Sequence, residues 1–416
     1  MASTADTRSD VIVIGAGLAG LACAADLLEA GLRVRVLEAS DAVGGRMRTD
    51  TVAGFRLDRG FQVFNTSYPQ VKRRLDLRAL KLRPFTAGIL LAQGDQRIRL
   101  GDPTRRAAHL PDLLPGRFAS TRDLAALTLL GGRDLLTPPA LLRRGRDTST
   151  REALTTAGIS DDLVDALLRP FLASVFLEDA LETSSRFFHL VLRSMLRGTL
   201  CLPAGGIRAV PEQLAAALPP GTVQIHSPVG ELEGTEVHLA DGTVLGADTV
   251  VVATGASAAQ GLIPGLDTPA GRTVTTVYHA VARPPLPEPT LLVDGSRTVL
   301  HTCVLTEVAP TYSTDGRALV STSVLGADED GLEVRVRARL AELYRTDTDR
   351  WEHIDTTTVV DALPAMPAPH PLMRDPRLGK GRFVCGDHRA TGSVQGALAS
   401  GARAARAVRA DRQRQV

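Results

Sequence analysis

Three glycines near the N-terminus have the spacing at which a protein backbone binds phosphate. Gly15, Gly17 and Gly20 lie between a short apolar run, Asp10 to Ile14, and an Ala- and Leu-rich stretch, Leu21 to Ala30. The first glycine permits a tight strand-to-helix turn, the second lets the backbone approach a pyrophosphate, and the third lets the helix pack closely on the strand. The helix N-terminus then offers unpaired N–H groups to the anion.

An acidic residue follows the second predicted strand, Arg33 to Leu37. This residue, Glu38, can accept hydrogen bonds from a ribose 2′-hydroxyl, and its charge disfavours a 2′-phosphate. Strand, glycine turn, helix, strand and acid together form a β-α-β unit typical of dinucleotide binding, whereas a chance glycine cluster lacks this context. The unit alone does not separate NAD from FAD.

A second glycine pair follows within a few residues. Gly44 and Gly45 again permit close backbone approach, and Arg46 can grip phosphate oxygens with its planar guanidinium. With this extension, the run Val11–Thr49 resembles the flavoprotein superfamily of amine oxidases, protoporphyrinogen oxidases and carotenoid desaturases. The resemblance implies FAD.

The C-terminal region is similar to the closing flavin motif of that superfamily, at Gly386-Asp387 and Thr391–Ala397. By this resemblance Asp387 binds ribityl hydroxyls, and a helix starting near Ser393 points N–H groups at the flavin O2, where they stabilise the reduced ring. We expect Asp387 to be buried beside the ribityl chain and Glu38 to bind a more exposed ribose. No cysteine apart from Cys385 lies in this motif, so we expect the FAD to be non-covalent.

Two weaker similarities complete the predicted site. The segment Asp58–Gln62 resembles the one that passes the flavin ring, and Val229 matches the position whose backbone meets the adenine. The predicted cofactor-binding residues are Gly15, Gly17, Leu18, Ala19, Gly20, Glu38, Ala39, Gly44, Gly45, Arg46, Gly60, Phe61, Gln62, Val229, Gly386, Asp387, Ser393, Val394 and Ala397.

Within the superfamily, Arg169–Phe176 and Leu202–Ile207, followed by Pro211–Ala215, resemble the desaturase and protoporphyrinogen-oxidase branch. The amine oxidases carry a substrate-domain lysine and an aromatic cage. The matching strand here, Thr273–His279, has no lysine, and Gly392–Val394 has no cage tyrosine. An amine cation would therefore lose its cation–π host.

We therefore predict an FAD-dependent oxidoreductase of the desaturase or oxidase type. It would take a hydride from a C–H or N–H bond of a bulky apolar molecule onto flavin N5, with the cofactor carrying the chemistry. An amine or amino-acid oxidase is one alternative, and a flavin-dependent isomerase or non-redox flavin-binding protein is another. No residue is assigned as catalytic. Five histidines are candidates for a base, and His388 stands out because it follows Gly386-Asp387; the others are His109, His189, His279 and His301.

Only one glycine fingerprint has the strand-and-helix context of a nucleotide site. We therefore expect the substrate, and not a nicotinamide, to reduce the flavin. Dioxygen, a quinone or another small oxidant would then accept the electrons.

Composition excludes several other classes of protein. The 416 residues carry 48 Lys+Arg against 46 Asp+Glu, which gives no electrostatic case for nucleic acid. The four cysteines, Cys23, Cys201, Cys303 and Cys385, show no CxxC spacing, so neither a disulfide framework nor a metal site is expected.

The N-terminal residues lack an apolar signal region, and no run is long enough to span a membrane. We expect a cytoplasmic protein. The apolar, arginine-dotted stretch Leu110–Arg146 is either a lid of ordinary helices, which we favour, or a peripheral membrane contact.

The expected fold is α/β. A discontinuous Rossmann-like FAD domain with a parallel sheet would comprise residues 1–75, 200–260 and 375–416, and residues 76–199 and 261–374 would form a substrate domain of antiparallel sheet plus helices. Expected helices include Arg122–Leu130, Thr150–Ala157, Asp161–Leu168, Ser184–Arg197, Leu332–Tyr344 and Ser393–Arg409. Expected strands include Val223–His226, Glu236–Leu239, Thr243–Leu245, Asp248–Val252, Val274–Ala282, Thr298–Leu305 and Ala318–Val324.

Overall fold

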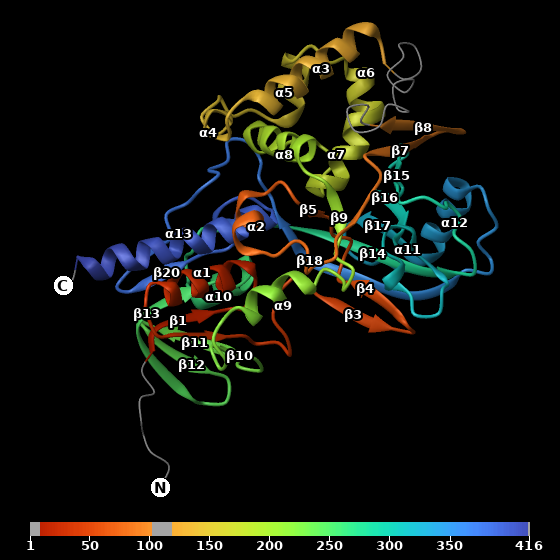
Figure 1. The fold of residues 1–416 in the computed structure, drawn as a ribbon. Helices are drawn as coiled ribbons and strands as arrows, with labels where there is room; N and C mark the ends of the chain where they lie inside the picture. Colours follow the sequence, from red (N-terminus) through yellow and green to blue (C-terminus); the bar gives the residue numbers. More distant parts are fainter. Residues whose placement is uncertain (1–8, 102–118, 415–416) are drawn as a thin grey trace.

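Two large sheets organise the computed structural model, which describes residues 9–101 and 119–414. In Figure 1 the strands of the first sheet lie at the lower left and those of the second at the right, with a group of helices above them. The mixed α/β architecture, with one mainly parallel and one mainly antiparallel sheet, confirms the expected fold class.

The first sheet is built around apolar strands that are buried on both faces, as parallel strands between helices are. Its order is β10-β2-β1-β13-β12-β11, with β20 beside the C-terminal half of β13 and β19 at its edge. The pairs β10–β2, β2–β1, β1–β13 and β13–β20 are parallel. The bounds are β1 Ser9–Ile14, β2 Val34–Leu37, β10 Val223–Gln224, β11 Val229–Glu233, β12 Glu236–Leu239, β13 Val244–Val252, β19 Arg377–Gly379 and β20 Arg382–Val384.

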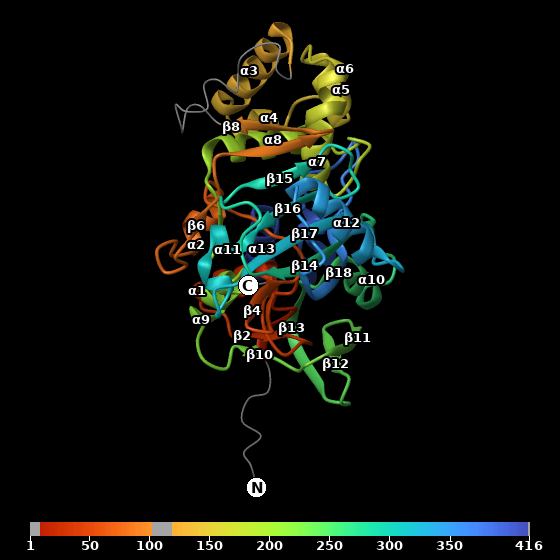
Figure 2. The same cartoon turned by 90° about the vertical axis from the view of Figure 1, so that its right-hand side faces the viewer.

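The second sheet is stacked as seven strands in the order β18-β14-β17-β16-β15-β7-β8, a progression that Figure 2 shows from the middle of the molecule upward. Its long central strand β14 is buried along most of its length and pairs antiparallel with both β18 and β17. The bounds are β7 Gly88–Gln93, β8 Gln96–Gly101, β14 Gly271–Val281, β15 Leu291–Asp294, β16 His301–Val304, β17 Ala318–Leu325 and β18 Glu352–Pro364.

Helices cover both sheets. α1 (Leu18–Glu29) and α13 (Val394–Gln413) pack so closely that a Cβ on Gly401 would lie 2.1 Å from the carbonyl oxygen of Ala19. The upper group in Figure 1 comprises α3 Thr121–Leu136, α4 Pro139–Leu142, α5 Thr150–Thr156, α6 Asp161–Leu163, a π-helical turn Val164–Leu168, α7 Arg169–Phe176 and α8 Ser185–Arg197. The remaining helices are α2 Pro69–Arg74, α9 Ala209–Ala216, α10 Ala256–Leu262, α11 Leu305–Val308 and α12 Leu332–Tyr344.

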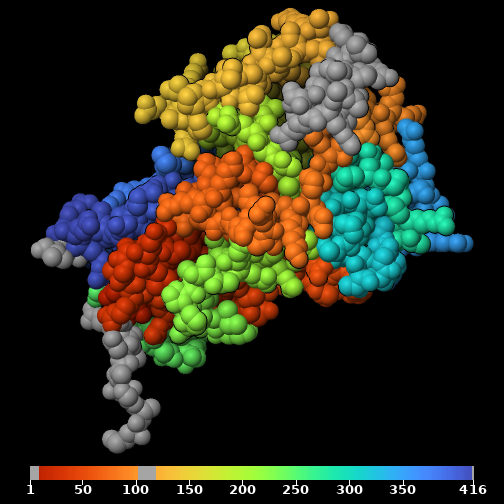
Figure 3. All heavy atoms as spheres, in the orientation of Figure 1, coloured from red at the N-terminus to blue at the C-terminus, as the bar shows by residue number. Residues whose placement is uncertain are grey.

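Two small sheets join these parts: β3 (Thr49–Val52) pairs with β4 (Phe55–Asp58), and β9 (Leu200–Leu202) pairs with β5 (Phe64–Asn65) and β6 (Arg83–Pro84). Segments far apart in sequence therefore meet on one face, where Figure 3 shows the red N-terminal residues beside green and blue ones. Strands of the first sheet fall inside the segments expected for a cofactor domain, and strands of the second fall inside those expected for a substrate domain. The domain division itself stays a prediction.

One local expectation needs correction, and some strands were not foreseen. The segments Thr243–Leu245 and Asp248–Val252 form one continuous strand, β13, because its first half pairs with β12 and its second half with β20. The strands β7, β8, β15 and β18 were not expected from the sequence. Part of the stretch Leu110–Arg146 lies outside the described residues; its described part forms α3 and α4, on which Leu129 and Leu136 are exposed.

Candidate active site

A cavity of about 1290 Å³ lies between the first sheet, the second sheet and the upper helices. All of the predicted cofactor-binding residues line this cavity except Gly20. The cavity therefore brings together segments from both ends and the middle of the chain.

The glycine turn after β1 has the geometry that phosphate binding requires. Gly15 has a φ of +105°, and a Cβ there would lie 2.9 Å from the carbonyl oxygen of Ala253. A Cβ on Gly17 would meet nothing within 4 Å, so this glycine leaves open space at the N-terminus of α1. Gly20 faces away from the cavity, because a Cβ there would lie 1.9 Å from the carbonyl oxygen of Gly15. Its role is packing.

Glu38 holds this turn from the end of β2. Its Oε2 accepts a hydrogen bond from the backbone N–H of Ala16 at 2.7 Å, and its Oε1 accepts from the N–H and Oγ of Ser40 at 3.0 and 2.7 Å. Glu38 and Asp387 are both buried: the two residues are 9% and 6% exposed. The tight loop that follows β2 covers Glu38.

Arg46 and Asp387 form an ion pair on the cavity wall, with 2.6 Å between Nη2 and Oδ1. Arg46 also donates to the carbonyl oxygens of Asp361 and Ala362 at 3.1 and 2.7 Å, which joins the glycine pair to β18. The Asp387 carboxylate raises the pKa of Arg46. In this geometry the guanidinium is directed at Asp387, and its contact with phosphate stays a prediction.

The C-terminal helix begins where the sequence motif places it. The side chain of Ser393 caps α13 by accepting a hydrogen bond from the N–H of Gly396 at 3.0 Å. A Cβ on Gly396 would lie 1.9 Å from the carbonyl oxygen of Thr391, so only glycine fits in this first turn. Ser393, Val394 and the helix start all face the cavity.

The loop Gly60–Gln62 crosses the cavity wall and is fixed from behind by a buried carboxylate, Asp58. Burial raises the pKa of Asp58. Its side chain accepts hydrogen bonds from the Thr49 hydroxyl at 2.6 Å, the Tyr312 hydroxyl at 2.8 Å and the Ile207 N–H at 2.9 Å. Since these groups come from separate segments, the loop is held in one position against both sheets.

The rest of the cavity has a different character. Helices α7 and α8, strands β7 and β15 and the segment before β7 surround it with apolar side chains: Phe85, Ile89, Phe171, Val175, Phe187, Val191, Met195, Leu196 and Leu291. All three lysines of the sequence, Lys72, Lys81 and Lys380, lie in the described part of the chain, and none lines the cavity. This apolar part can hold a hydrocarbon and exclude water.

The family model described as flavin containing amine oxidoreductase matches residues 18–409. The chain belongs to this family. It is a flavin-dependent oxidoreductase, as the sequence motifs predict.

Two relatives extend the comparison. The chain is 29% identical over 287 residues to a zeta-carotene-forming phytoene desaturase of Myxococcus xanthus, covering 59% of this chain and 54% of the relative. It is 30% identical over 312 residues to hydroxysqualene dehydroxylase of Rhodopseudomonas palustris, covering 68% and 71%. The match thus spans about half the length of the first relative. The desaturase relative agrees with the branch predicted from the sequence.

Solved structures share the fold over nearly the whole chain. A putative protoporphyrinogen oxidase from Exiguobacterium sp. 255-15 has a TM-score of 0.72 at 16% identity, covering 98% of this chain and all of that one. Cyclohexylamine oxidase from Brevibacterium oxydans has a TM-score of 0.69 at 19% identity, covering 97% and 99%. At these identities the likeness concerns the fold alone. Among the described helices of this family member, none is long and apolar enough to cross a membrane.

The candidate histidines of the flavoprotein separate into two groups. His301 and His388 line the cavity, and burial lowers their pKa values to about 3 and about 4, so both rings are neutral near pH 7. Neither ring nitrogen of either residue has a hydrogen-bond partner among the described residues. His189 and His279 lie elsewhere, paired with Asp134 and Glu333. His109 falls outside the described residues.

Sequence reasoning missed two parts of the site. Thr254–Ser257, the turn between β13 and α10, lines the cavity; its signal was a buried strand ending in small residues. The end of β18 also lines it, and Asp361 there has a φ of +56° beside a register shift in the β14–β18 pairing. No residue pattern marks that bulge in advance.

Proposed function

We propose that the protein binds FAD non-covalently and takes a hydride from a bulky apolar small molecule. One observation carries the proposal: a single cavity runs from the glycine turn after β1 to the apolar surround of α7 and α8. The named activities of the desaturase and dehydroxylase relatives, which concern long hydrocarbon molecules, support the same substrate class.

The polar part of the cavity fits a flavin dinucleotide. The backbones of Gly17 and Gly45 lie close together on the cavity wall, since a Cβ on Gly45 would lie 3.6 Å from the Cα of Gly17, and a Cβ on Gly17 would meet nothing within 4 Å. The N-termini of α1 and α13 both reach this cavity, and each is favourable for negative charge. By this proposal Gly17, Gly45 and α1 hold the pyrophosphate, Glu38 the ribose, and Asp387 the ribityl chain. When bound, FAD supplies the electron-accepting ring.

The apolar part of the cavity would position the substrate and exclude water from it. The side chains of α7 and α8 pack a hydrocarbon against the loop Gly60–Gln62, and they exclude water from the place where a C–H bond reacts. His301 is the histidine nearest Phe61, with 4.5 Å between ring centroids, and it remains neutral. A small oxidant such as dioxygen or a quinone would then take the electrons. We also propose that the two large sheets belong to separate cofactor and substrate domains.

Anaerobic mixing of the purified yellow protein with phytoene and with cyclohexylamine tests this function. We expect flavin bleaching with an apolar substrate and none with the amine. Bleaching by the amine alone would establish amine oxidation, and turnover without net bleaching would establish isomerisation; either result contradicts the proposal.

A matched pair of variants tests whether the substrate binds in the apolar part of the cavity. Val191→Trp fills the apolar part and should slow bleaching by the apolar substrate while leaving the flavin spectrum unchanged. Leu141→Trp makes a similar change on the exposed surface of α4, away from the cavity lining, and should have no effect. Equal rates in the two variants would show that the substrate lies elsewhere.

A further inference from the structure

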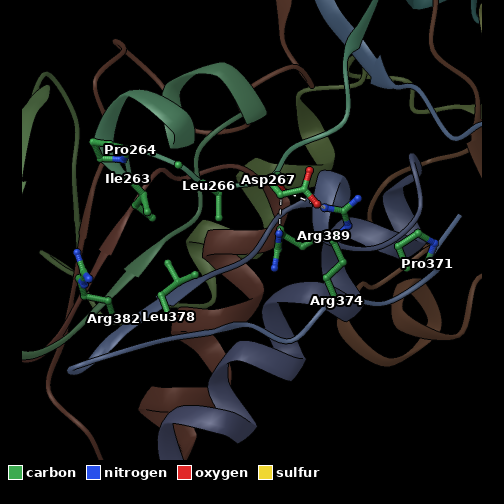
Figure 4. Close-up of a pocket in the computed structure, with 10 residues that line it drawn as sticks. Ile263, Pro264, Leu266, Asp267, Pro371, Arg374, Leu378, Arg382 and Arg389 are labelled. Carbon is green, nitrogen blue, oxygen red and sulfur yellow. Dashed lines mark hydrogen bonds and ion pairs between the residues drawn. The ribbon is translucent and has the colours of Figure 1, made fainter.

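A second cavity, of about 530 Å³, lies at the surface beyond the end of α10, and we name it the arginine pocket. Its floor is apolar and includes Ile263, Leu266 and Leu378, while three arginines project from its walls. In Figure 4, Arg374 and Arg389 lie beside Asp267, and Arg382 lies at the other end, beyond Leu378. The arginine pocket shares no lining residue with the large cavity.

Arg389 is a buried cation without a carboxylate partner. The residue is 9% exposed, and its guanidinium donates to the backbone carbonyl oxygens of Asp267 and Asp375 at 3.1 and 3.0 Å. No carboxylate oxygen of the described residues lies within ion-pair distance of it, and its Nε has no partner there. Burial and the nearby charge of Arg374 lower the pKa of Arg389, and the more distant carboxylates of Asp267 and Asp375 offset this only in part.

The other charges do not neutralise the arginine pocket. The carboxylate of Asp267 binds Arg374 at 2.6 Å, but this side chain is 84% exposed. Asp375 pairs with Arg377 and does not line the pocket. The guanidinium of Arg382 has no hydrogen bond or ion pair with any part of the chain that the structure describes. Three arginines thus face one carboxylate, a net positive charge around an apolar floor.

We infer that the arginine pocket binds a small anionic amphiphile, a phosphate or carboxylate group carried on a short hydrocarbon. Guanidinium groups form charge-assisted, two-pronged hydrogen bonds with these anions, which are stronger than neutral ones. The anion would supply the missing counter-charge for Arg382, and the hydrocarbon would cover Ile263, Leu266 and Leu378. An anion alone satisfies only the first requirement, and an uncharged hydrocarbon only the second.

The site is also next to the proposed cofactor contact. Arg389 is the last residue of a 3₁₀ turn, Asp387–Arg389, whose first two residues line the large cavity. An occupied arginine pocket therefore changes the surroundings of a turn that faces the flavin. Flavin absorbance provides an optical readout of binding that is independent of turnover.

Hexyl phosphate, inorganic phosphate and hexanol are the probes, titrated calorimetrically into the flavin-loaded protein at constant ionic strength. We expect saturable binding of hexyl phosphate, with inorganic phosphate and hexanol each weaker by about tenfold or more. Equal binding of inorganic phosphate would show that the apolar residues do not contribute to binding. The absence of saturable binding would overturn the inference. Phospholipid vesicles form a separate arm: binding to vesicles but not to hexyl phosphate also contradicts a soluble ligand.

Arg382→Gln and Arg374→Gln locate the binding. Arg382→Gln should weaken hexyl phosphate by about tenfold, the loss expected for a hydrogen bond to a charged group, and Arg374→Gln, at the other end of the pocket, should weaken it by less. Arg335→Gln on α12 removes the same charge from a remote, exposed position and should have no effect. Because Arg382 has no partner to lose, that variant should fold normally even if Arg374→Gln does not. Binding that survives in Arg382→Gln, or falls equally in Arg335→Gln, would place the ligand elsewhere.

Discussion

The two parts of the large cavity are lined by different kinds of groups. The part near β1 consists of glycines, helix starts and a few polar side chains, so its shape comes from the backbone. The part near α7 and α8 consists of apolar side chains from segments that meet only in the folded chain. Glycine positions that shape the backbone tolerate almost no substitution, whereas an apolar lining stays apolar through many substitutions among hydrophobic residues. The part proposed to bind the cofactor is therefore specified by local sequence, and the part proposed to bind the substrate is specified by packing.

The largest expected effect comes from adding a side chain to the glycine turn after β1. Gly17→Val places a branched side chain in the open space at the N-terminus of α1, where the pyrophosphate is proposed to bind. Because its Cβ meets no protein atom within 4 Å, the fold should persist while flavin binding is abolished. Flavin absorbance after gel filtration measures the loss.

Gly246→Val is the control for this change. Gly246 is an exposed strand residue whose Cβ would also meet nothing within 4 Å, and it lies outside the cavity. This variant should keep its flavin. Full retention of flavin by Gly17→Val would show that the phosphate lies elsewhere.

A smaller effect is expected from the two buried carboxylates. Asp387→Ala leaves Arg46 without its ion-pair partner, and it removes the proposed ribityl contact. Glu38→Ala removes hydrogen bonds to Ala16 and Ser40, and we expect water to replace part of its proposed contact with a more exposed ribose. We expect Asp387→Ala to weaken FAD more, with a loss of about 1–3 kcal/mol. Fluorescence titration should give the order Asp387→Ala, Asp387→Asn, wild type; a greater loss in Glu38→Ala would reverse the assignment.

The same contrast explains what the sequence could predict. The glycine turn, Glu38, Arg46 and Asp387 carry local patterns, and the structure brings them to one cavity. The turn at Asp241-Gly242 between β12 and β13 and the cap that Ser149 provides for α5 also depend on residues close in sequence. Strand β18 was not predicted, since it contacts the cavity through a bulge at Asp361 that depends on pairing with β14. Long-range pairing of this kind leaves no mark in the sequence around one residue.

The histidines of the cavity give a pH dependence of stability. The unfolded chain binds a proton at His301 below about pH 6.5, whereas the folded pKa is about 3, so unfolding takes up a proton in this window. Stability must therefore fall as the pH is lowered from 6.5 towards 3. His301→Phe removes this term, and between pH 7 and 5 its free energy of unfolding should fall by about 2 kcal/mol less than that of the wild type.

Urea denaturation at the two pH values measures this difference. His226→Asn, which removes an exposed histidine at a positive φ that asparagine tolerates, is the control and should follow the wild type. Parallel curves for His301→Phe and the wild type would mean that the folded state also protonates His301, contrary to its burial.

The last prediction is that NADH and NADPH have no effect on the flavin, because the substrate is the expected electron donor. The sequence has one glycine fingerprint with strand, helix and acid, and it is already assigned to the proposed FAD site at β1 and α1. In the second sheet, β14 pairs antiparallel with β17 and β18, and the parallel pair β7–β15 joins strands from distant parts of the chain. Among the described residues, this sheet therefore has no compact β-α-β unit of the kind that binds a pyrophosphate. We therefore expect NADH and NADPH to reduce the flavin no faster than buffer does under argon, in stopped-flow mixing with the oxidised protein. An apolar substrate that bleaches the same sample is the positive control. Rapid, saturable bleaching by either nicotinamide would contradict the division of the cavity, because a second nucleotide would then have to bind in the part lined by α7 and α8.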